Sequence, residues 1–304
     1  MARSPETIDF SIIVPTRDRH AQLAACLDAL AELRYPASRF EVVVVDDGSR
    51  TPVEPVLEPR RERLQIRLRT QPGAGPARAR NHGADAARGR FLAFTDDDCA
   101  PAPDWLEKLA VRLADAPDAV AGGCTVNLLK DNLFATASQS LLSYLYEYFS
   151  DNRGVPWFLA SCNFALAAST FHSVGGFDPS YPTAAAEDRD ICDRLRLHGY
   201  SMVYAPDAVV YHEHALDLRK FWSQHFGYGR GACRFWRAHR DRSGGKIRIE
   251  PPAFYWGMLM YPLHHRSRAP LAVAALLLVS QVANLAGFLC EWRLCGVRLN
   301  SAIR

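Results

Sequence analysis

The sequence lacks the features that mark several other classes of protein. Its eight cysteines are scattered, with neither a Cys-x-x-Cys pair nor the dense framework of small secreted proteins, which indicates reduced thiols in a cytosolic compartment. Charge of one sign is not in excess, because 36 Lys and Arg stand against 33 Asp and Glu, and this balance disfavours nucleic acid as the main partner. Arg3, Glu6 and Asp9 interrupt the apolar stretch that a secretory signal peptide needs, so we expect no export by that route.

Two glycine-rich phosphate-binding motifs are also missing. The first apolar block, residues 10–14, is followed by Pro15 rather than by the Gly-x-Gly-x-x-Gly turn of dinucleotide-binding folds, and no Walker A sequence occurs. The chain does have 304 residues, 48% of them hydrophobic, which is enough for the core of one large or two ordinary domains. We therefore expect a folded protein outside those two nucleotide-binding classes.

Short apolar blocks alternate with helical patterns in the amino-terminal third of the chain. Residues 40–45 are a nearly continuous apolar run, as expected for a strand covered on both faces of a parallel sheet, and residues 90–94 are a further predicted strand. Leucines at helical spacing predict a helix over residues 21–33, and an alanine-rich stretch predicts another over residues 76–87. This alternation predicts an α/β fold with a doubly wound sheet, whose ligands bind beyond the carboxyl ends of the strands.

The carboxy-terminal two thirds continue the pattern with weaker signals. Residues 158–167 and 209–212 are predicted strands, and residues 187–198 are a predicted helix that ends at a glycine. We place a domain boundary near residue 216. Beyond it, the glycines of residues 227–231 suggest a loop that closes over phosphates, and the arginine-rich residues 234–248 suggest an exposed, mobile basic segment.

Three clusters of acidic residues stand at the ends of these elements. Residues 46–49 and 95–98 each follow a predicted strand, and Glu187 and Asp188 begin the predicted helix. Three adjacent carboxylates repel one another unless a cation shares them, and hard oxygen ligands together with a diphosphate favour Mg²⁺ or Mn²⁺. Taken alone, each cluster also fits a solvated turn or a helix cap.

The order of several motifs resembles that of the family 2 glycosyltransferases. The segments are SIIVPTRDR, VVVVDDGS, PARARNHGADAARGRFLAFTDDD, GGFD and AAEDRDICDRLRLHGY, which fall within residues 9–215, about two thirds of the chain. The resemblance implies a GT-A fold, a nucleotide-binding α/β sandwich with a mostly parallel central sheet, here followed by a helical carboxy-terminal tail. It also implies transfer of a sugar from a nucleoside diphosphate sugar with inversion, usually with a divalent metal.

The resemblance further implies a division of the chain. Residues 1–215 would form the catalytic domain, with a nucleotide-binding half over about 1–100 and an acceptor half over 101–215, and residues 216–304 would form the tail. Motif by motif, it assigns the donor nucleotide and its phosphates to Pro15, Thr16, Arg17, Asp46, Asp47, Arg80, Asn81 and Asp97.

The remaining site residues follow from the same motifs. Asp96 and Asp98 match the family's Asp-x-Asp motif, which holds the metal, and His212 matches a position that adds a metal or diphosphate contact in some relatives. Asp188 matches the aspartate of the Glu-Asp motif, which acts as the general base, with Glu187 beside it. Trp157 and Asn163 resemble the segment that lines the acceptor side, although a tryptophan buried in the core fits Trp157 equally well.

Residues 271–290 are a run of 20 residues without charge, about the length that crosses a bilayer as a helix. Ser280 and Asn284 fall on one face of such a helix, so a helix in the membrane interface or one packed against protein fits nearly as well. Basic residues stand on both sides and leave the orientation open. We expect membrane association, with the catalytic part in the cytoplasm at the cytoplasmic face of the inner membrane.

The sequence thus predicts a hexosyltransferase-type enzyme that moves a sugar from a nucleoside diphosphate sugar to a hydroxyl of a glycan or lipid-linked acceptor, in polysaccharide biosynthesis of the cell envelope. Only the usual donor preference of the family favours UDP. No sequence motif identifies the donor sugar or the acceptor, and none establishes whether the chain forms a homo-oligomer. One alternative is a catalytically silent subunit that binds nucleotide sugar or polysaccharide. Another is a sugar nucleotidyltransferase, although that class usually has a glycine- and lysine-rich segment where this chain has residues 16–19.

Overall fold

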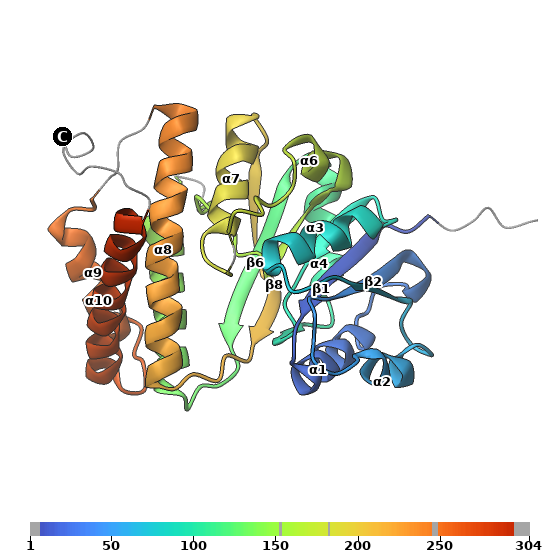
Figure 1. The fold of residues 1–304 in the computed structure, drawn as a ribbon, viewed down its shortest axis with the longest axis horizontal. Helices are drawn as coiled ribbons and strands as arrows, with labels where there is room; N and C mark the ends of the chain where they lie inside the picture. The colour runs from blue at the N-terminus through green and yellow to red at the C-terminus, as the bar shows by residue number, and fades with distance from the viewer. Residues whose placement is uncertain (1–6, 152–153, 182, 245–248, 295–304) are drawn as a thin grey trace, which may run out of the picture. The chain divides into compact units, whose positions relative to one another are not determined.

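The computed structural model describes residues 7–151, 154–181, 183–244 and 249–294 (Figure 1). Contacts within the chain divide it into two compact units. Unit 1 consists of Met1–Val126, Phe158–Pro182 and Ile191–Glu213, and unit 2 consists of Asn127–Trp157, Thr183–Asp190 and His214–Arg304.

Unit 1 is built on a mixed sheet of eight strands among the described residues, in the order β3-β2-β1-β4-β7-β6-β8-β5. Neighbours among the first four strands pair in parallel, and these strands are β1 (Phe10–Thr16), β2 (Phe40–Asp46), β3 (Ile66–Thr70) and β4 (Phe91–Phe94). The pairs β4–β7, β6–β7 and β5–β8 are antiparallel, with β5 (Cys99–Pro101), β6 (Val120–Asn127), β7 (Phe164–Ala167) and β8 (Met202–His212). The predicted α/β class is confirmed, in a mixed sheet in which β1–β4 are parallel neighbours.

The helices of unit 1 cover this sheet through apolar side chains at helical spacing. Leu23, Leu27 and Leu30 of one helix are fully buried, in the same core as Val42 and Val44 of β2. The elements are α1 (His20–Ala31), α2 (Glu54–Leu57), α3 (Pro76–Ala86), α4 (Trp105–Asp115), α6 (Ala168–Ser173), α7 (Glu187–Leu197), and the short 3₁₀ turns η1 (Ala37–Arg39) and η2 (Glu58–Arg60). The first turn of α7 belongs to unit 2 and the rest of it to unit 1.

Two strands differ in length from their predictions. β7 begins only at Phe164, six residues after the predicted start, because residues 161–163 directly before it form a turn and a bend. β8 begins at Met202, seven residues before the predicted start. Pro206 and Asp207 lie exposed inside β8 and interrupt its apolar pattern, and proline in an apolar run argues against a strand.

Unit 2 is helical and has a core of its own. Its helices are α5 (Leu133–Tyr148), α8 (Leu218–Ser243), α9 (Pro252–His264) and α10 (Pro270–Leu294). They bury an apolar cluster that includes Tyr144, Phe221, Met258 and Leu277. The helical tail predicted from the sequence is therefore present, and α5 joins it in the same unit.

The predicted phosphate-covering loop over residues 227–231 is wrong, because these residues lie inside α8. The glycines allow another helix to approach closely: a Cβ on Gly229 would overlap the carbonyl oxygen of Asn284, and one on Gly287 would overlap that of Phe226. The predicted mobile segment 234–248 is likewise helical as far as Ser243, and residues 245–248 lie outside the described residues.

This packing makes opposite predictions for two glycines of α8. Gly229→Ala should lower the free energy of unfolding by about 1–3 kcal/mol, because the added methyl forces α8 and α10 apart. Gly227→Ala is the matched control, since a Cβ there meets nothing within 4 Å and alanine should stabilise the helix by about 0.5–1 kcal/mol. Urea unfolding followed by circular dichroism measures both, and shifts of the same sign would contradict the assigned packing.

Candidate active site

The first two acidic clusters lie at one edge of the parallel half of the sheet. Pro15 and Thr16 end β1, and Thr16 pairs in register with Asp46, the last residue of β2. β4 lies on the other side of β1 and leads into residues 95–98. Because parallel neighbours end at the same edge, these residues come together as the sheet forms.

Asp47 shapes the loop that enters α3. One oxygen of its carboxylate accepts hydrogen bonds from Nε2 of Gln71 and the backbone N–H of Ala74, both at 2.7 Å, and the other accepts from the backbone N–H of Gly75 at 2.9 Å. Gly75 has φ of 92°, a backbone conformation that favours glycine. Asp46 is buried and closes its own turn by accepting the backbone N–H of Ser49 at 2.9 Å.

A second set of contacts ties the loop after β1 to the loop after β2. The carboxylate of Asp18 accepts the backbone N–H of Arg50 at 2.8 Å and its Nε–H at 3.1 Å, while the N–H of Asp18 donates to Oγ of Ser49 at 2.9 Å. Asp18 has φ of 55°, a strained value for a residue other than glycine. The guanidinium of Arg17 lies against Gly73, where a Cβ would be 2.7 Å from Nη1. Three loops therefore meet beside β1 and β2.

Asp97 faces the protein interior. It accepts a hydrogen bond from Oγ1 of Thr16 at 2.8 Å and from Nη1 of Arg19 at 2.9 Å. Burial raises the pKa of Asp97 to about 6, although the charge of Arg19 lowers it. Asp97 thus binds both ends of the loop after β1 to the loop after β4.

Arg80 and Asn81 connect α3 to two other segments. Nη2 of Arg80, which is buried, donates to Oδ1 of Asp96 at 2.7 Å, and its guanidinium carbon lies 5.5 Å from the centre of the Phe177 ring. The side-chain amide of Asn81 donates to the carbonyl of Phe177 at 2.7 Å and accepts its N–H at 2.9 Å. Arg80 and Asn81, which the sequence assigns to the nucleotide, both bind other groups of the protein in the structure.

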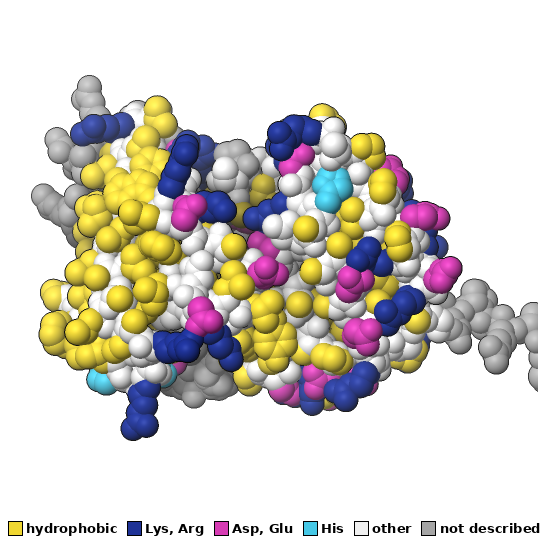
Figure 2. Space-filling model, turned by 90° about the horizontal axis from the view of Figure 1, so that it is seen from below, with side chains coloured by type: hydrophobic (Ala, Val, Ile, Leu, Met, Phe, Trp, Pro, Cys, Tyr) yellow, Lys and Arg dark blue, Asp and Glu magenta, His cyan; other side chains and the backbone are white. Residues whose placement is uncertain are grey.

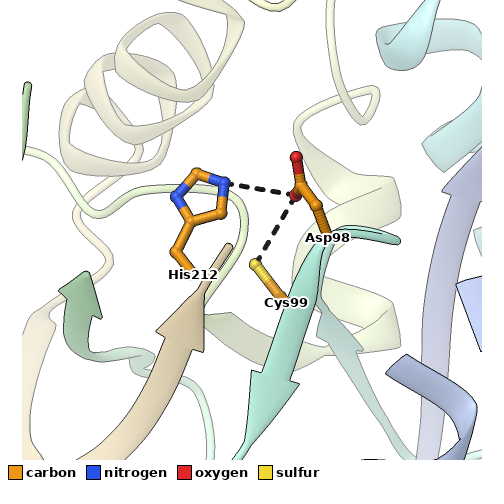
Figure 3. Close-up of side chains that lie close together, drawn as sticks. All are labelled: Asp98, Cys99 and His212. Atoms are coloured by element: carbon orange, nitrogen blue, oxygen red, sulfur yellow. Dashed lines mark hydrogen bonds and ion pairs between the residues drawn. The ribbon is translucent and has the colours of Figure 1, made fainter. Parts of the chain in front are cut away.

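Asp98 and His212 lie side by side (Figure 3). The antiparallel pairing of β5 and β8 places Cys99 opposite His212, and Nε2 of His212 is 3.2 Å from Oδ1 of Asp98. Burial lowers the pKa of His212, but the hydrogen bond and the negative charge of Asp98 outweigh burial and raise it to about 9. Oδ2 of Asp98 accepts from Nη1 of Arg19 at 2.8 Å.

These atoms suit a divalent cation. Asp98 offers a carboxylate oxygen, which suits Mg²⁺ and Mn²⁺, and His212 offers an imidazole nitrogen close enough to share one ion with it. Of the three metal ligands predicted from the sequence, the structure brings Asp98 and His212 together and pairs Asp96 with Arg80.

Two residues of this site were not singled out in the sequence. Arg19 binds Asp97 and Asp98 with the same nitrogen, and Cys99 places its Sγ 3.9 Å from Oδ1 of Asp98. The sequence signal for Cys99 is its position directly after the three aspartates of residues 96–98. Arg19 gave none, because its partners lie 78 and 79 residues away in the chain.

The predicted base belongs to unit 2. Glu187 is buried, and Asp188 is partly exposed and accepts the backbone N–H of Arg189 at 2.8 Å. Ala186, directly before them, has φ of 70°, so a strained residue opens this helix turn. The buried Asp190 anchors the turn to α8 through an ion pair with Arg242 at 2.8 Å.

The two predicted acceptor residues have different surroundings. Trp157, in unit 2, is 53% exposed, with its ring centre 6.1 Å from that of Phe149. Asn163, in unit 1, is buried, and its amide donates to the carbonyls of Cys124 and Ala208 at 3.0 and 2.9 Å. Its Oδ1 accepts the indole N–H of Trp105 at 2.8 Å, so Asn163 links three segments of the sheet region.

The fold is of the GT-A type. The mannosyltransferase PcManGT from Pyrobaculum calidifontis, solved with GDP-Man and Mn²⁺, matches with a TM-score of 0.61 over 98% of this chain and 79% of its own, at 21% sequence identity. Residues 1–349 of S. aureus TarS, solved with UDP, match with a TM-score of 0.55 over 90% of this chain and 92% of its own, at 17% identity. At these identities the likeness is one of fold.

The chain belongs to glycosyl transferase family 2, whose family model matches residues 11–172, and the model of glycosyl transferase family group 2 matches residues 92–300. It is 30% identical over 244 residues to the pre-mycofactocin glycosyltransferase of Mycobacterium tuberculosis, covering 79% of this chain and 50% of the relative. It is 29% identical over 226 residues to the validoxylamine A glucosyltransferase of Streptomyces hygroscopicus, covering 65% and 50%. The chain thus spans about half the length of these two relatives.

Proposed function

We propose that the protein is an inverting glycosyltransferase that moves a sugar from a nucleoside diphosphate sugar, with UDP as the favoured nucleotide, to a hydroxyl group of a glycan or lipid-linked acceptor. The observation that carries the proposal is the cation-compatible pair of Asp98 and His212 beside the loops fixed by Asp47. The names of the relatives support it, since they describe transfer of glucose in one case and glycosyl transfer in another. Neighbours of the same fold were solved with GDP-Man and Mn²⁺ and with UDP-GlcNAc.

The nucleotide would lie against the loops that follow β1 and β2. The carboxylate of Asp47 preorganises residues 71–75, so the surface that meets the base and ribose is built before the ligand arrives. Arg17 stands on the same loops and supplies a cation for the phosphates. Arg80 stabilises the Asp96 carboxylate at the neighbouring strand end.

Asp98 and His212 would hold Mg²⁺ or Mn²⁺, with Asp96 as a further oxygen donor. When bound, the cation neutralises the negative charge that grows on the diphosphate as it leaves. Arg19 binds one oxygen of Asp98, and the other oxygen lies beside His212, where these two residues would hold the cation. Asp97 contributes by fixing Thr16 and Arg19.

Asp188 would act as the base that takes the proton from the acceptor hydroxyl. Its place in the first turn of α7 suits this role, because the helix dipole favours the ionised carboxylate. The hydroxyl oxygen then attacks the anomeric carbon from the face opposite the diphosphate, which gives inversion. The ion pair of Asp190 with Arg242 holds the first turn of α7 in place. Glu187, directly before Asp188, is buried.

The proposed function is tested by adding a panel of UDP- and GDP-sugars to the full chain, with and without Mn²⁺. A true donor should raise the free energy of unfolding by about 2.7 kcal/mol at 100 times its Kd, only with the cation, and should be hydrolysed slowly to nucleoside diphosphate. Stabilisation without hydrolysis or transfer would favour a silent binding subunit. Release of pyrophosphate from a nucleoside triphosphate and a sugar phosphate would favour a nucleotidyltransferase.

The surface of unit 2 supports association with a membrane. α10 (Pro270–Leu294) is long and apolar enough to cross a bilayer, with a mean hydropathy of 2.0 in its most apolar window. One side of it is exposed, and Figure 2 shows a broad apolar surface over this part of the molecule. The exposed apolar residues of α10 are Leu271, Leu278, Val282, Leu285, Leu289 and Leu294.

We propose that α10 lies in the plane of the membrane surface. Its other side packs along α8 through Gly229 and Gly287, and its buried Glu291 pairs with Arg230 and Arg234 at 2.7 and 2.8 Å. If α10 crossed a bilayer, it would carry this charged stretch of α8 into the hydrocarbon, at a high cost. The exposed Trp256 of α9 and the basic side chains of His264, His265, Arg266 and Arg268 suit the headgroup region of an anionic lipid surface.

Sedimentation with lipid vesicles tests this docking. We expect binding to vesicles that contain phosphatidylglycerol, weakening with salt, and a loss of about tenfold or more for Leu278→Glu with Leu285→Glu, since each buried leucine contributes roughly 1.5–3 kcal/mol. Val111→Glu, an equally exposed apolar position on α4, is the control and should bind normally. A dimer without lipid that the double variant abolishes would instead assign the apolar face to a second copy of the chain.

A further inference from the structure

The cation site contains a third ligand atom besides those of Asp98 and His212. Sγ of Cys99 lies 3.9 Å from Oδ1 of Asp98, and the ligand atoms of Asp98, Cys99 and His212 all lie within 4.8 Å of one another. Figure 3 shows the thiol and the imidazole directed at the same carboxylate from neighbouring strands. An oxygen, a nitrogen and a sulfur atom that can each bind a metal therefore lie close together.

We infer that Cys99 turns this cation site into one that binds Zn²⁺, through the carboxylate of Asp98, the imidazole of His212 and the thiolate of Cys99. The inference rests on the proposed cation role of Asp98 and His212 and adds the metal that the site prefers in the absence of nucleotide. All three ligands belong to unit 1.

The distances between the donor atoms suit a tetrahedral ion. Zn²⁺ binds nitrogen and oxygen at about 2.0–2.2 Å and sulfur at about 2.3 Å, so its ligand atoms stand roughly 3.3–3.6 Å apart. The nitrogen–oxygen distance here is 3.2 Å, the sulfur–oxygen distance is 3.9 Å, and all three atoms lie within 4.8 Å of one another, so binding requires side-chain rotations that bring the sulfur closer to the other two ligand atoms. Three protein ligands leave a fourth position open, as in Zn²⁺ sites that also bind water or substrate.

The chemistry of the donors favours Zn²⁺ over Mg²⁺ and Mn²⁺. Carboxylate and water suit the harder ions, whereas thiolate selects Zn²⁺ and other softer ions, and imidazole suits Zn²⁺ as well. On binding, the thiol gives its proton to solvent and its sulfur forms the bond to the metal.

The surroundings hold the thiol in place. Cys99 belongs to β5 and pairs in register with His212 of β8, so both ligands stand on rigid strands. Sγ of Cys99 donates to Oδ1 of Asp98 at 3.9 Å, and Cys162, buried in the same core, has its Sγ 3.7 Å from Oγ1 of Thr125. A hydrogen-bonded environment of this kind orients a metal ligand and tunes it.

A consequence follows for the proposed reaction. Zn²⁺ held by Asp98, Cys99 and His212 would occupy the ligands that Mn²⁺ or Mg²⁺ needs for the diphosphate. The full chain should therefore bind either a hard cation with nucleotide or Zn²⁺ alone, and the two states should exclude each other.

Cobalt provides the direct test, because Co²⁺ replaces Zn²⁺ and reports on its ligands by its absorption. Titration of the reduced full chain with Co²⁺ should give a sulfur-to-cobalt charge-transfer band in the near ultraviolet together with visible bands of tetrahedral intensity. Zn²⁺ should abolish both. In Cys99→Ser and Cys99→Ala the charge-transfer band should vanish, while Cys124→Ser, which changes a partly exposed thiol of the same unit, should keep it.

The ratio of Zn²⁺ to Mn²⁺ affinity separates a ligand from a merely structural residue. Removing a ligand should cost at least as much as removing a group that orients one, so Cys99→Ser should weaken Zn²⁺ by about 10- to 100-fold or more and leave Mn²⁺ affinity nearly unchanged. Equal losses for both ions, or a wild-type chain that binds Co²⁺ without the band, would overturn the role of Cys99. A chain that binds no divalent cation at all would overturn the proposed cation site as well.

Discussion

Asp98→Ala is expected to abolish the cation-dependent binding of a nucleoside diphosphate and to lower sugar transfer by roughly 100- to 1,000-fold, the usual loss when a group that stabilises developing charge is removed. The reason is that Asp98 supplies the oxygen next to His212 and is also held by Arg19. Calorimetry with UDP in the presence and absence of Mn²⁺, together with initial rates of transfer, measures both effects.

Controls distinguish this loss from a folding defect. Asp98→Asn keeps the shape of the side chain and should show the same loss of cation dependence with a smaller change in thermal midpoint. Asp104→Ala, which removes a carboxylate of the same unit in a surface ion pair with Arg34, should behave like the wild type. Unchanged binding in Asp98→Ala would refute the cation role.

Asp188→Asn should leave donor binding intact and lower transfer by about 100- to 10,000-fold, the range that a positioned base contributes. The amide keeps the size of the side chain and still accepts the N–H of Arg189, so the helix turn should survive. Donor affinity by calorimetry and transfer rates under single-turnover conditions separate the two effects.

Asp193→Asn provides the matched control, because it alters a partly exposed carboxylate on the same helix. We expect it to retain most of the activity. Normal turnover in Asp188→Asn would remove the base assignment, and a parallel loss of donor affinity would point to a structural role of the turn instead.

The parallel half of the sheet could be predicted because its signals are local. Val42–Val45 form an uninterrupted apolar run, and the buried strand they predict is β2. The acids after β2 and β4 follow from chain order, since strands in parallel register end at one edge.

The partners of the site residues could not be predicted in the same way. Asn81 is bound to Phe177 across 96 residues of sequence, and Arg80 to Asp96 across 16. Such pairs depend on how the helices lie on the sheet, and a single sequence carries no periodic signal for them. The same holds for Gly229. In the sequence it resembles a loop residue, and only the structure shows that it lies against Asn284 of α10.

The position of β4 has a consequence for synthesis of the chain. β4 stands between β1, which precedes it, and β7, which is not complete until Ala167. While the ribosome makes the intervening residues, the nascent amino-terminal half presents an open, fully apolar strand edge, the kind that recruits other chains. β7 covers this edge of β4 only after residues 164–167 have been made, so we expect a chain truncated between β4 and β7 to aggregate.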